Sequence, residues 1–149
     1  MIHKKIEGID FYELSDLIET AIFWWQDDWF SAGYPLAIYS GLNTAEENDT
    51  AADKIAKCLL AGSKVMFYDR WASDADDFHG ELPHKFIDGE MVYYVTMNDV
   101  LKGLTLAANS SYISDRRAVA NIDDYGCNTD ADDAYRIIQY IMFGKRVRG

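Results

Sequence analysis

The helix that decides the fold of this chain is predicted by the stretch Thr129-Asp-Ala-Asp-Asp-Ala-Tyr-Arg-Ile-Ile-Gln-Tyr-Ile-Met-Phe143, which Gly144 and Lys145-Arg-Val-Arg148 follow. Thr129 is placed to cap the N-terminus, with Asp132 as its reciprocal partner three residues later. Further aspartates fall in the first turn and basic residues follow the glycine, which is the charge order that the helix dipole favours. Because the start signal, the stop signal and the polarity agree, we predict a helix that ends at Gly144.

This helix has one apolar and one polar face. The apolar residues recur at helical spacing: Ala131, Ala134, Tyr135, Ile137, Ile138, Ile141 and Met142. We expect that face to pack in the core. On the other side, Asp132 and Asp133 lie within one turn of Arg136, so a local ion pair accounts for them. Tyr140 and Phe143 also project toward the polar side, which predicts that residues 109–128 or a partner cover part of it.

The composition predicts one domain with its own core. The chain has 149 residues, of which 49% are hydrophobic. No apolar run approaches the ~20 residues of a bilayer span and no signal sequence is present, so we expect no membrane contact and a cytoplasmic location. The net charge of −11 argues against direct binding to nucleic acid, because the basic residues at 145–148 fit a helix C-terminus better than a phosphate site. Cys58 and Cys127 are expected to be reduced thiols.

The first half of the chain predicts a strand and two helices. Residues 2–12 have the character of an extended segment. A long helix begins between Asp10 and Ser15, carries an apolar stripe as far as Trp29, and is ended by Gly33 and Pro35. Residues 34–42 form a connector with a candidate short strand at 37–39. A second helix starts at Thr44, where Glu47 completes a capping box.

The second half predicts the rest of the sheet and two more helices. Residues 64–69 are apolar on both faces, which indicates an interior strand. Asp88-Gly89 is a hairpin turn signal, and Thr96 with Asp99 caps a third helix. Residues 109–128 are predicted to be irregular, with a candidate one-turn helix. The helix that ends at Gly144 follows them. The prediction is a single α+β domain of about four helices packed on a small, at least partly antiparallel sheet.

The loop after the interior strand is the place to look for a metal. It contains six candidate ligands: Asp74, Asp76, Asp77, His79, Glu81 and His84. Their spacing matches no zinc pattern, and an EF-hand is excluded because His79 stands where a glycine is needed. An acidic loop in solvent explains these residues better, so we predict no metal and no cofactor, with His79 and His84 as the imidazoles that a metal would have to use.

Enzyme activity has little support, because the chain contains no nucleophile elbow, no P-loop and no dinucleotide-binding glycine motif. Binding to a protein is the alternative. Phe23, Trp24 and Phe30 fall off the apolar stripe of the first helix, so either the rest of the chain or a partner covers them. Asp74, Asp76 and Asp77 could imitate nucleic-acid phosphates toward a basic protein, and ordinary solubility charge is the simpler explanation of the same residues.

Four blocks of the sequence resemble small acidic proteins encoded by phages, prophages and mobile elements of gut bacteria. These blocks are Leu17–Trp25, Leu60–Asp69, Tyr94–Leu104 and Asp130–Gly144, about half of the chain. The group has no established activity. The resemblance implies an accessory role in a bacterial host cell, a class that includes inhibitors of restriction and CRISPR defences.

Together these observations favour a small, phage-type accessory protein that binds another protein. An acidic inhibitor of a host nucleic-acid-binding or defence protein is the specific form of this hypothesis. Its candidate partner-binding residues are Asp74, Asp76, Asp77, Phe23, Trp24 and Phe30. The alternatives are a metal-dependent or carboxylate-based hydrolase and a homo-oligomeric structural component, for which a homodimer is the simplest form.

Overall fold

The computed structural model describes residues 9–23, 29–122 and 130–148. In these ranges the chain forms six helices and a four-stranded sheet. In chain order the elements are α2 (Phe11–Phe23), β1 (Phe30–Gly33), α3 (Leu36–Ser40), α4 (Ala51–Leu60), β2 (Val65–Asp69), β3 (His84–Ile87), β4 (Glu90–Val95), α5 (Met97–Ala108), α6 (Ile113–Ile122) and α7 (Ala131–Phe143). The predicted α+β class is confirmed. None of the described helices has the length and apolar character that a bilayer span requires.

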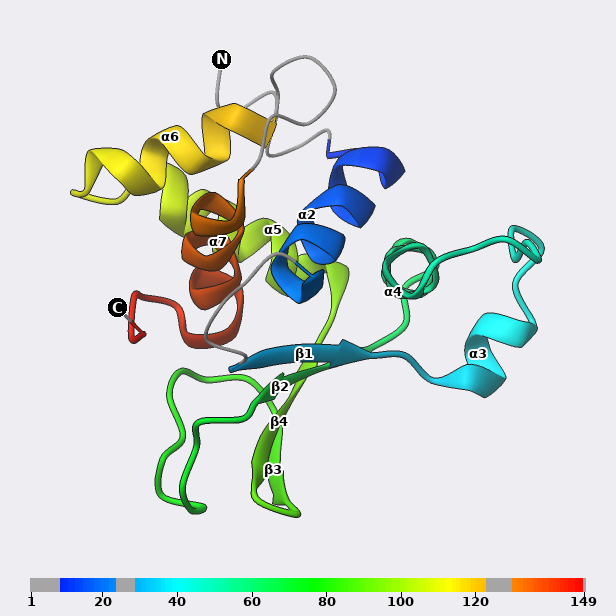
Figure 1. Cartoon of the computed structure of the whole chain (residues 1–149), viewed down its shortest axis with the longest axis horizontal. Helices are drawn as coiled ribbons and strands as arrows, with labels where there is room; N and C mark the ends of the chain where they lie inside the picture. The colour runs from blue at the N-terminus through cyan, green and yellow to red at the C-terminus, as the bar shows by residue number, and fades with distance from the viewer. Residues whose placement is uncertain (1–8, 24–28, 123–129, 149) are drawn as a thin grey trace.

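The sheet has the strand order β1-β2-β4-β3 and is antiparallel throughout. Most of the helices gather above it, whereas α3 lies to one side beyond α4 and the β3–β4 hairpin projects below (Figure 1). The interior position predicted for residues 64–69 is confirmed, because β2 pairs with both β1 and β4. The hairpin is confirmed as well. Asp88 and Gly89 both have positive φ, 51° and 82°, as a type I′ turn requires.

Two helix boundaries agree closely with the sequence signals. Thr96 and Asp99 form the predicted capping box of α5, with hydrogen bonds in both directions. Gly144 ends α7 in the left-handed conformation at φ 73°. The N-terminal cap of α7 is Asp130, whose Oδ1 accepts a hydrogen bond of 2.8 Å from the Asp133 backbone N–H. The predicted cap, Thr129, lies outside the described residues.

The first helix begins within the predicted range but is shorter than predicted at its C-terminal end. It begins at Phe11, so the extended segment predicted for residues 2–12 is wrong for its last two residues, while residues 2–8 lie outside the described ranges. The helix also does not continue through Phe30, because residues 30–33 are β1. The register with β2 pairs Phe30 with Asp69, and the Phe30 ring packs edge to face on that of Phe67, with the centroids 5.1 Å apart.

Three further predictions are wrong in the described structure. Residues 37–39 belong to the short helix α3 and form no strand. Helix α4 starts at Ala51, behind a capping box of Thr50 and Asp53, so Thr44 and Glu47 cap nothing and residues 43–49 are free to form a loop over α4. The irregular 109–128 segment contains the ten-residue helix α6, which buries Ala118, Val119 and Ile122. The described structure therefore has six helices where about four were expected.

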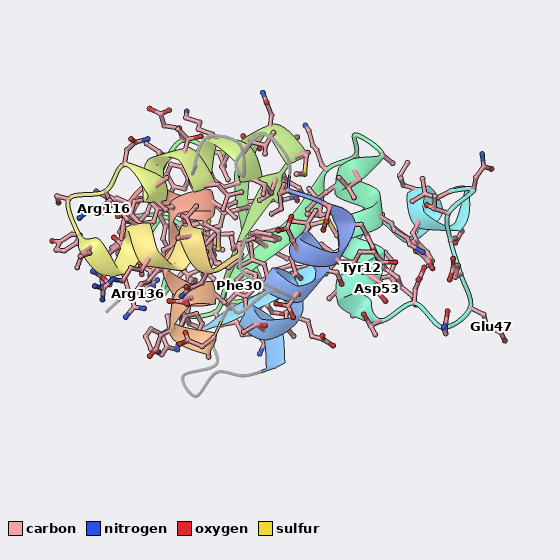
Figure 2. All side chains as sticks on the ribbon, turned by 90° about the horizontal axis from the view of Figure 1, so that it is seen from above. Tyr12, Phe30, Glu47, Asp53, Arg116 and Arg136 are labelled. Atoms are coloured by element: carbon pink, nitrogen blue, oxygen red, sulfur yellow. The ribbon has the colours of Figure 1, made fainter. Side chains whose placement is uncertain are left out.

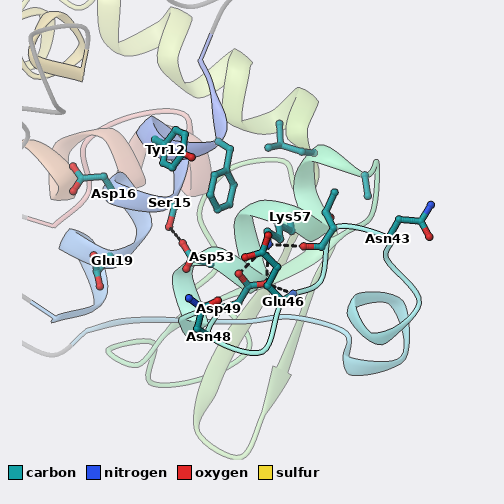
Figure 3. A pocket seen from close by; sticks show the side chains of 14 residues that line it. Tyr12, Ser15, Asp16, Glu19, Asn43, Glu46, Asn48, Asp49, Asp53 and Lys57 are labelled. Atoms are coloured by element: carbon teal, nitrogen blue, oxygen red, sulfur yellow. Dashed lines mark hydrogen bonds and ion pairs between the residues drawn. The ribbon is translucent and has the colours of Figure 1, made fainter.

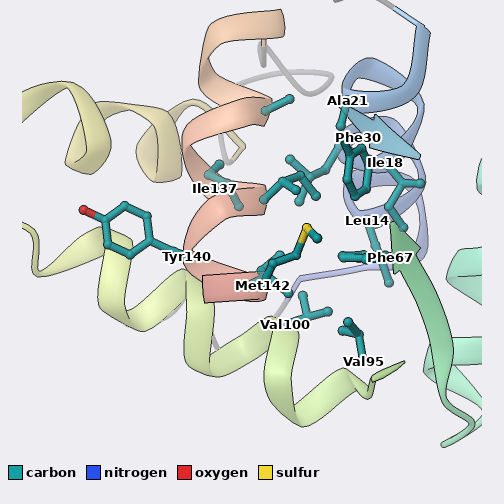
Figure 4. Packing of buried hydrophobic residues seen from close by; sticks show 14 of the residues in the cluster. Leu14, Ile18, Ala21, Phe30, Phe67, Val95, Val100, Ile137, Tyr140 and Met142 are labelled. Atoms are coloured by element: carbon teal, nitrogen blue, oxygen red, sulfur yellow. The ribbon is translucent and has the colours of Figure 1, made fainter. Parts of the chain in front are cut away.

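Helix α7 lies at the centre of the core. Ile137 and Met142 are buried between α2, α5 and the sheet (Figure 4), and Ile138 is fully buried as well. A Cβ on Gly103 of α5 would lie 2.6 Å from Ile141 Cγ1 and 2.7 Å from its backbone N and Cα, so the backbones of the two helices approach closely at that point. Tyr140 points away from this cluster (Figure 4) and donates a hydrogen bond of 2.6 Å to Asp115 of α6. The predicted cover for the second face of α7 is thus supplied within the chain.

Candidate functional site

A cleft of about 970 Å³ lies between α2, α4 and the loop of residues 43–49 (Figure 3). A cleft of this size falls at the upper end of the range typical of ligand sites. Its lining includes five carboxylates and one amine: Asp16, Glu19, Glu46, Asp49, Asp53 and Lys57. Phe11, Tyr12 and Leu60 add apolar surface. The cleft is therefore strongly anionic, with an aromatic wall.

Helical spacing explains why these residues meet. On α2, Tyr12, Asp16 and Glu19 recur at intervals of four and three, so they share one side of the helix. On α4, Asp53 and Lys57 are four residues apart and face the same space. Figure 3 shows the two rows on opposite sides of the cleft. Asp16 and Glu19 of α2 therefore form one wall of the cleft.

Asp49 anchors the loop that closes the cleft. Lys57 Nζ donates hydrogen bonds of 2.9 Å to both of its carboxylate oxygens and one of 2.6 Å to the Thr44 carbonyl. The Tyr39 hydroxyl donates another, of 2.6 Å. Burial opposes the charge of Asp49, but the hydrogen bonds from Lys57, Tyr39 and the Glu46 backbone outweigh it and lower the pKa of Asp49 to about 2. The positive charge of Lys57 is thus paired with the carboxylate of Asp49 on the 43–49 loop.

Asp53 ties α4 to α2. Its Oδ1 accepts a hydrogen bond of 2.6 Å from Ser15 Oγ, and its Oδ2 accepts one of 3.0 Å from the Thr50 backbone N–H. Burial works against ionisation, but the hydrogen bonds from Ser15 and Thr50 prevail and lower the pKa of Asp53. Asp53 is therefore ionised at neutral pH and leaves its charge in the cleft.

Asp16 is the carboxylate that the described chain does not balance. Burial, and then the neighbouring charge of Glu19, raise the pKa of Asp16. Its Oδ2 atom is buried and accepts no hydrogen bond within the described ranges. Tyr12, one turn earlier, is 75% exposed at the side of the same row. A carboxylate in this position gains from any cation that enters the cleft.

The loop of residues 70–83 brings the predicted acids Asp74, Asp76 and Asp77 together, outside the cleft. Asp74 and Asp76 are exposed, and Asp77 is half-buried. Two of them organise the loop: Asp74 Oδ1 accepts a hydrogen bond of 2.9 Å from the Asp76 backbone, and Asp77 Oδ2 accepts one of 3.0 Å from the Ser73 backbone. The hydrogen bonds from Ser73 lower the pKa of Asp77 against a smaller effect of burial.

The two candidate imidazoles have other contacts. His84 stacks on Phe78 with ring centroids 3.6 Å apart, and its Nδ1 lies 3.0 Å from the Leu82 carbonyl. His79 Nε2 lies 3.7 Å from Asp77 Oδ1. Within the described parts of the chain, no three metal-ligating side chains come close enough to share an ion.

The predicted aromatic surface is not assembled as expected. Phe30 is 2% exposed and packs in the core, so its ring does not face a partner. Phe23 is the last residue of α2, and Trp24 lies outside the described residues. Burial by the rest of the chain, the alternative that the sequence left open, therefore holds for Phe30.

No protein-family model, curated protein or solved structure matches this chain, so geometry alone supports the cleft as the candidate site. The sequence contained one usable signal for it. Two successive capping patterns, Thr44 with Glu47 and Thr50 with Asp53, compete for the start of α4. A helix start at Thr50 would have predicted that residues 43–49 form a loop, and this loop closes the cleft.

Proposed function

We propose that this protein is a non-enzymatic accessory protein that binds a basic segment of another protein in the cleft between α2 and α4. The observation that supports the proposal is the unbalanced charge of the cleft. Lys57 is paired with Asp49, whereas Asp16 has a buried oxygen without a hydrogen bond in the described structure. A lysine or arginine side chain supplies both the charge and the donors that such an oxygen lacks.

The shape and lining of the cleft suit that partner. Its volume of about 970 Å³ holds several side chains, and the ring of Tyr12 offers a surface for cation–π contact. The chain already uses this chemistry, since Lys57 Nζ lies 5.5 Å from the centroid of the Phe11 ring. The net charge of −11 would speed the approach of a basic partner and make binding sensitive to salt.

The resemblance to phage proteins suggests which partner to consider. A nucleic-acid-binding or defence protein of the bacterial host carries the lysines and arginines that such a cleft would bind, and occupying them would block access to nucleic acid. In this form of the proposal, Asp74 and Asp76 contribute to the long-range field rather than to the contact. The described residues show no geometry that favours the hydrolase or homo-oligomer alternatives over binding.

A charge-matched pair of variants tests the proposal. Binding of a short labelled peptide rich in lysine and arginine is measured by fluorescence anisotropy for the intact chain, for D16N/E19Q and for D74N/D76N. Both variants remove two negative charges. We expect D16N/E19Q to weaken binding by about tenfold or more, equivalent to ~1.4 kcal/mol, and D74N/D76N to weaken it less than about threefold.

Each other outcome has a definite meaning. If both variants weakened peptide binding equally, binding would depend only on the net charge of the chain, and the cleft would not be the binding site. A larger loss for D74N/D76N would move the contact to the 70–83 loop. Absence of any binding at low salt would contradict the proposal as a whole.

A further inference from the structure

Residues 145–148 lie along the protein surface like a bound peptide. The side chain of Gln139 on α7 holds their main chain through three hydrogen bonds. Its Oε1 accepts from the backbone N–H groups of Val147 and Arg148, at 2.7 and 2.6 Å, and its Nε2 donates to the Arg148 carbonyl at 2.7 Å. Gln139 is 2% exposed. The buried amide of Gln139 thus binds the main chain of this segment, and these three hydrogen bonds involve none of its side chains.

Arg148 lies between a buried carboxylate and a partly exposed aromatic ring. Its Nη2 donates to Asp69 Oδ2 at the end of β2. Its guanidinium carbon lies 5.8 Å from the ring centroid of Trp71. Asp69 is fully buried, and its other oxygen accepts a hydrogen bond of 3.0 Å from the Trp71 backbone. This carboxylate–aromatic pair is therefore suited to a planar, charged group with several donors.

Arg146 lies beside a second carboxylate–aromatic pair, Asp115 and Tyr112. Its Nε lies 3.8 Å from Asp115 Oδ1, and its guanidinium carbon lies 4.9 Å from the ring centroid of Tyr112. Asp115 is fully buried, and its other oxygen accepts hydrogen bonds from Tyr140 and Ser110. Two arginines separated by one residue thus meet two buried carboxylates, each with an aromatic ring beside it.

We propose that this surface is a binding site for an Arg-x-Arg segment of another protein, and that residues 145–148 of the chain itself compete for it. The amide of Gln139 holds the main chain at two successive N–H groups and one carbonyl, and the two carboxylate–aromatic pairs select arginine at alternate positions. Val147 lies between them, partly buried against the hydrophobic core. The site is distinct from the cleft between α2 and α4.

The fit of the intramolecular segment is incomplete, which makes it displaceable. Asp115 Oδ1 and Arg148 Nε are buried and form no hydrogen bond within the described residues. At 3.8 Å, Arg146 stays beyond hydrogen-bond distance of Asp115. The two arginine side chains are 29% and 17% exposed, so solvent and competing segments reach them. A segment whose first arginine donates to Asp115 Oδ1, and whose second arginine has no buried Nε without an acceptor, would bind more tightly than the one now in place.

The test supplies the sequence of residues 144–149 as a separate peptide. The peptide Gly-Lys-Arg-Val-Arg-Gly is added to the full-length chain and to its R146A/R148A variant, and saturable binding is measured. We expect the variant to bind the peptide at least about tenfold more tightly than the intact chain, and a peptide with alanine at both arginine positions to bind neither. K85A/K102A removes two positive charges from exposed positions elsewhere and should bind like the intact chain.

Equal binding by the intact chain, R146A/R148A and K85A/K102A would overturn the proposal, as would absence of binding by a folded R146A/R148A. Should that double variant fail to fold, the single variants R146A and R148A decide by the same comparison. This proposal and that of the cleft fail separately, because the cleft is tested on D16N/E19Q with both arginines in place.

Discussion

Asp69 and Arg148 lie 79 residues apart in the sequence and form an ion pair, with Nη2 and Oδ2 2.5 Å apart. The carboxylate side chain is fully buried and that of the arginine is 17% exposed. The pair joins the end of β2 to the segment that follows α7. The basic residues at 145–148, which the sequence assigns to a helix terminus, therefore also balance carboxylates buried elsewhere in the fold.

Replacing the arginine should be costly for that reason. R148A leaves Asp69 buried without a counter-ion, and we expect a loss of about 3 kcal/mol in the free energy of unfolding. R146A should cost about 1 kcal/mol, because Asp115 keeps its hydrogen bonds from Tyr140 and Ser110. Urea unfolding of the two variants measures the difference. Equal losses would mean that Asp69 is balanced by some other group.

Local signals in the sequence predicted the elements that local interactions determine. Gly144, the Asp88-Gly89 turn and the Thr96–Asp99 box each act within a few residues, and each is found in place. Strand β1 could not be predicted in this way. Its four residues, Phe-Ser-Ala-Gly, show no clear alternation and become a strand by pairing with β2, more than thirty residues later. The capping pattern at Thr50 could have indicated the loop of the cleft, but not its facing wall, because Asp16 and Glu19 come from a separate helix.

The competing capping patterns allow a direct test of the α4 boundary. Thr50 Oγ1 accepts a hydrogen bond of 3.1 Å from the Asp53 backbone, so T50A should cost about 1 kcal/mol in the free energy of unfolding. Thr44 is exposed and gives only its backbone carbonyl to Lys57, which alanine retains. T44A should therefore cost less than about 0.5 kcal/mol. Thermal or urea unfolding measures the stability of both variants. A larger loss for T44A than for T50A would mean that α4 starts at Thr44.

The contact of α5 with α7 predicts that Gly103 tolerates no side chain. A Cβ there would lie 2.6 to 2.7 Å from atoms of Ile141, two of them in the backbone. G103A should lower the free energy of unfolding by about 3 kcal/mol or more, as overpacking of a core does at its most severe. Gly41 is the control, since its φ is −89° and an added Cβ would meet only ordinary contacts at 3.6 Å and beyond. Comparable losses for G41A and G103A would refute this account.

The low pKa of Asp49 predicts part of the acid sensitivity of the fold. The pKa of Asp49 is about 2 in the folded chain against an ordinary value of 3.8, so between these two values the unfolded state binds more protons. The stabilisation is present above pH 4 and is lost as the pH falls toward 2. D49N should be less stable than the intact chain at pH 7, and the gap should narrow below pH 4. A gap that is constant with pH would show that the charge of Asp49 does not stabilise the fold.

Asp16 should show the opposite dependence, because the folded chain raises its pKa through burial and the charge of Glu19. An acid with a raised folded-state pKa is best tolerated when protonated, so its effect on stability becomes unfavourable as the pH rises through 4 and above. D16N should therefore be at least as stable as the intact chain at pH 7, with the advantage disappearing near pH 3. A binding carboxylate is expected to carry such a cost, since sites are often held at the expense of stability. Urea unfolding at pH 7 and pH 3 measures the stability difference between D16N and the intact chain. If D16N were less stable at pH 7, the ionised Asp16 side chain would stabilise the fold, which contradicts this prediction.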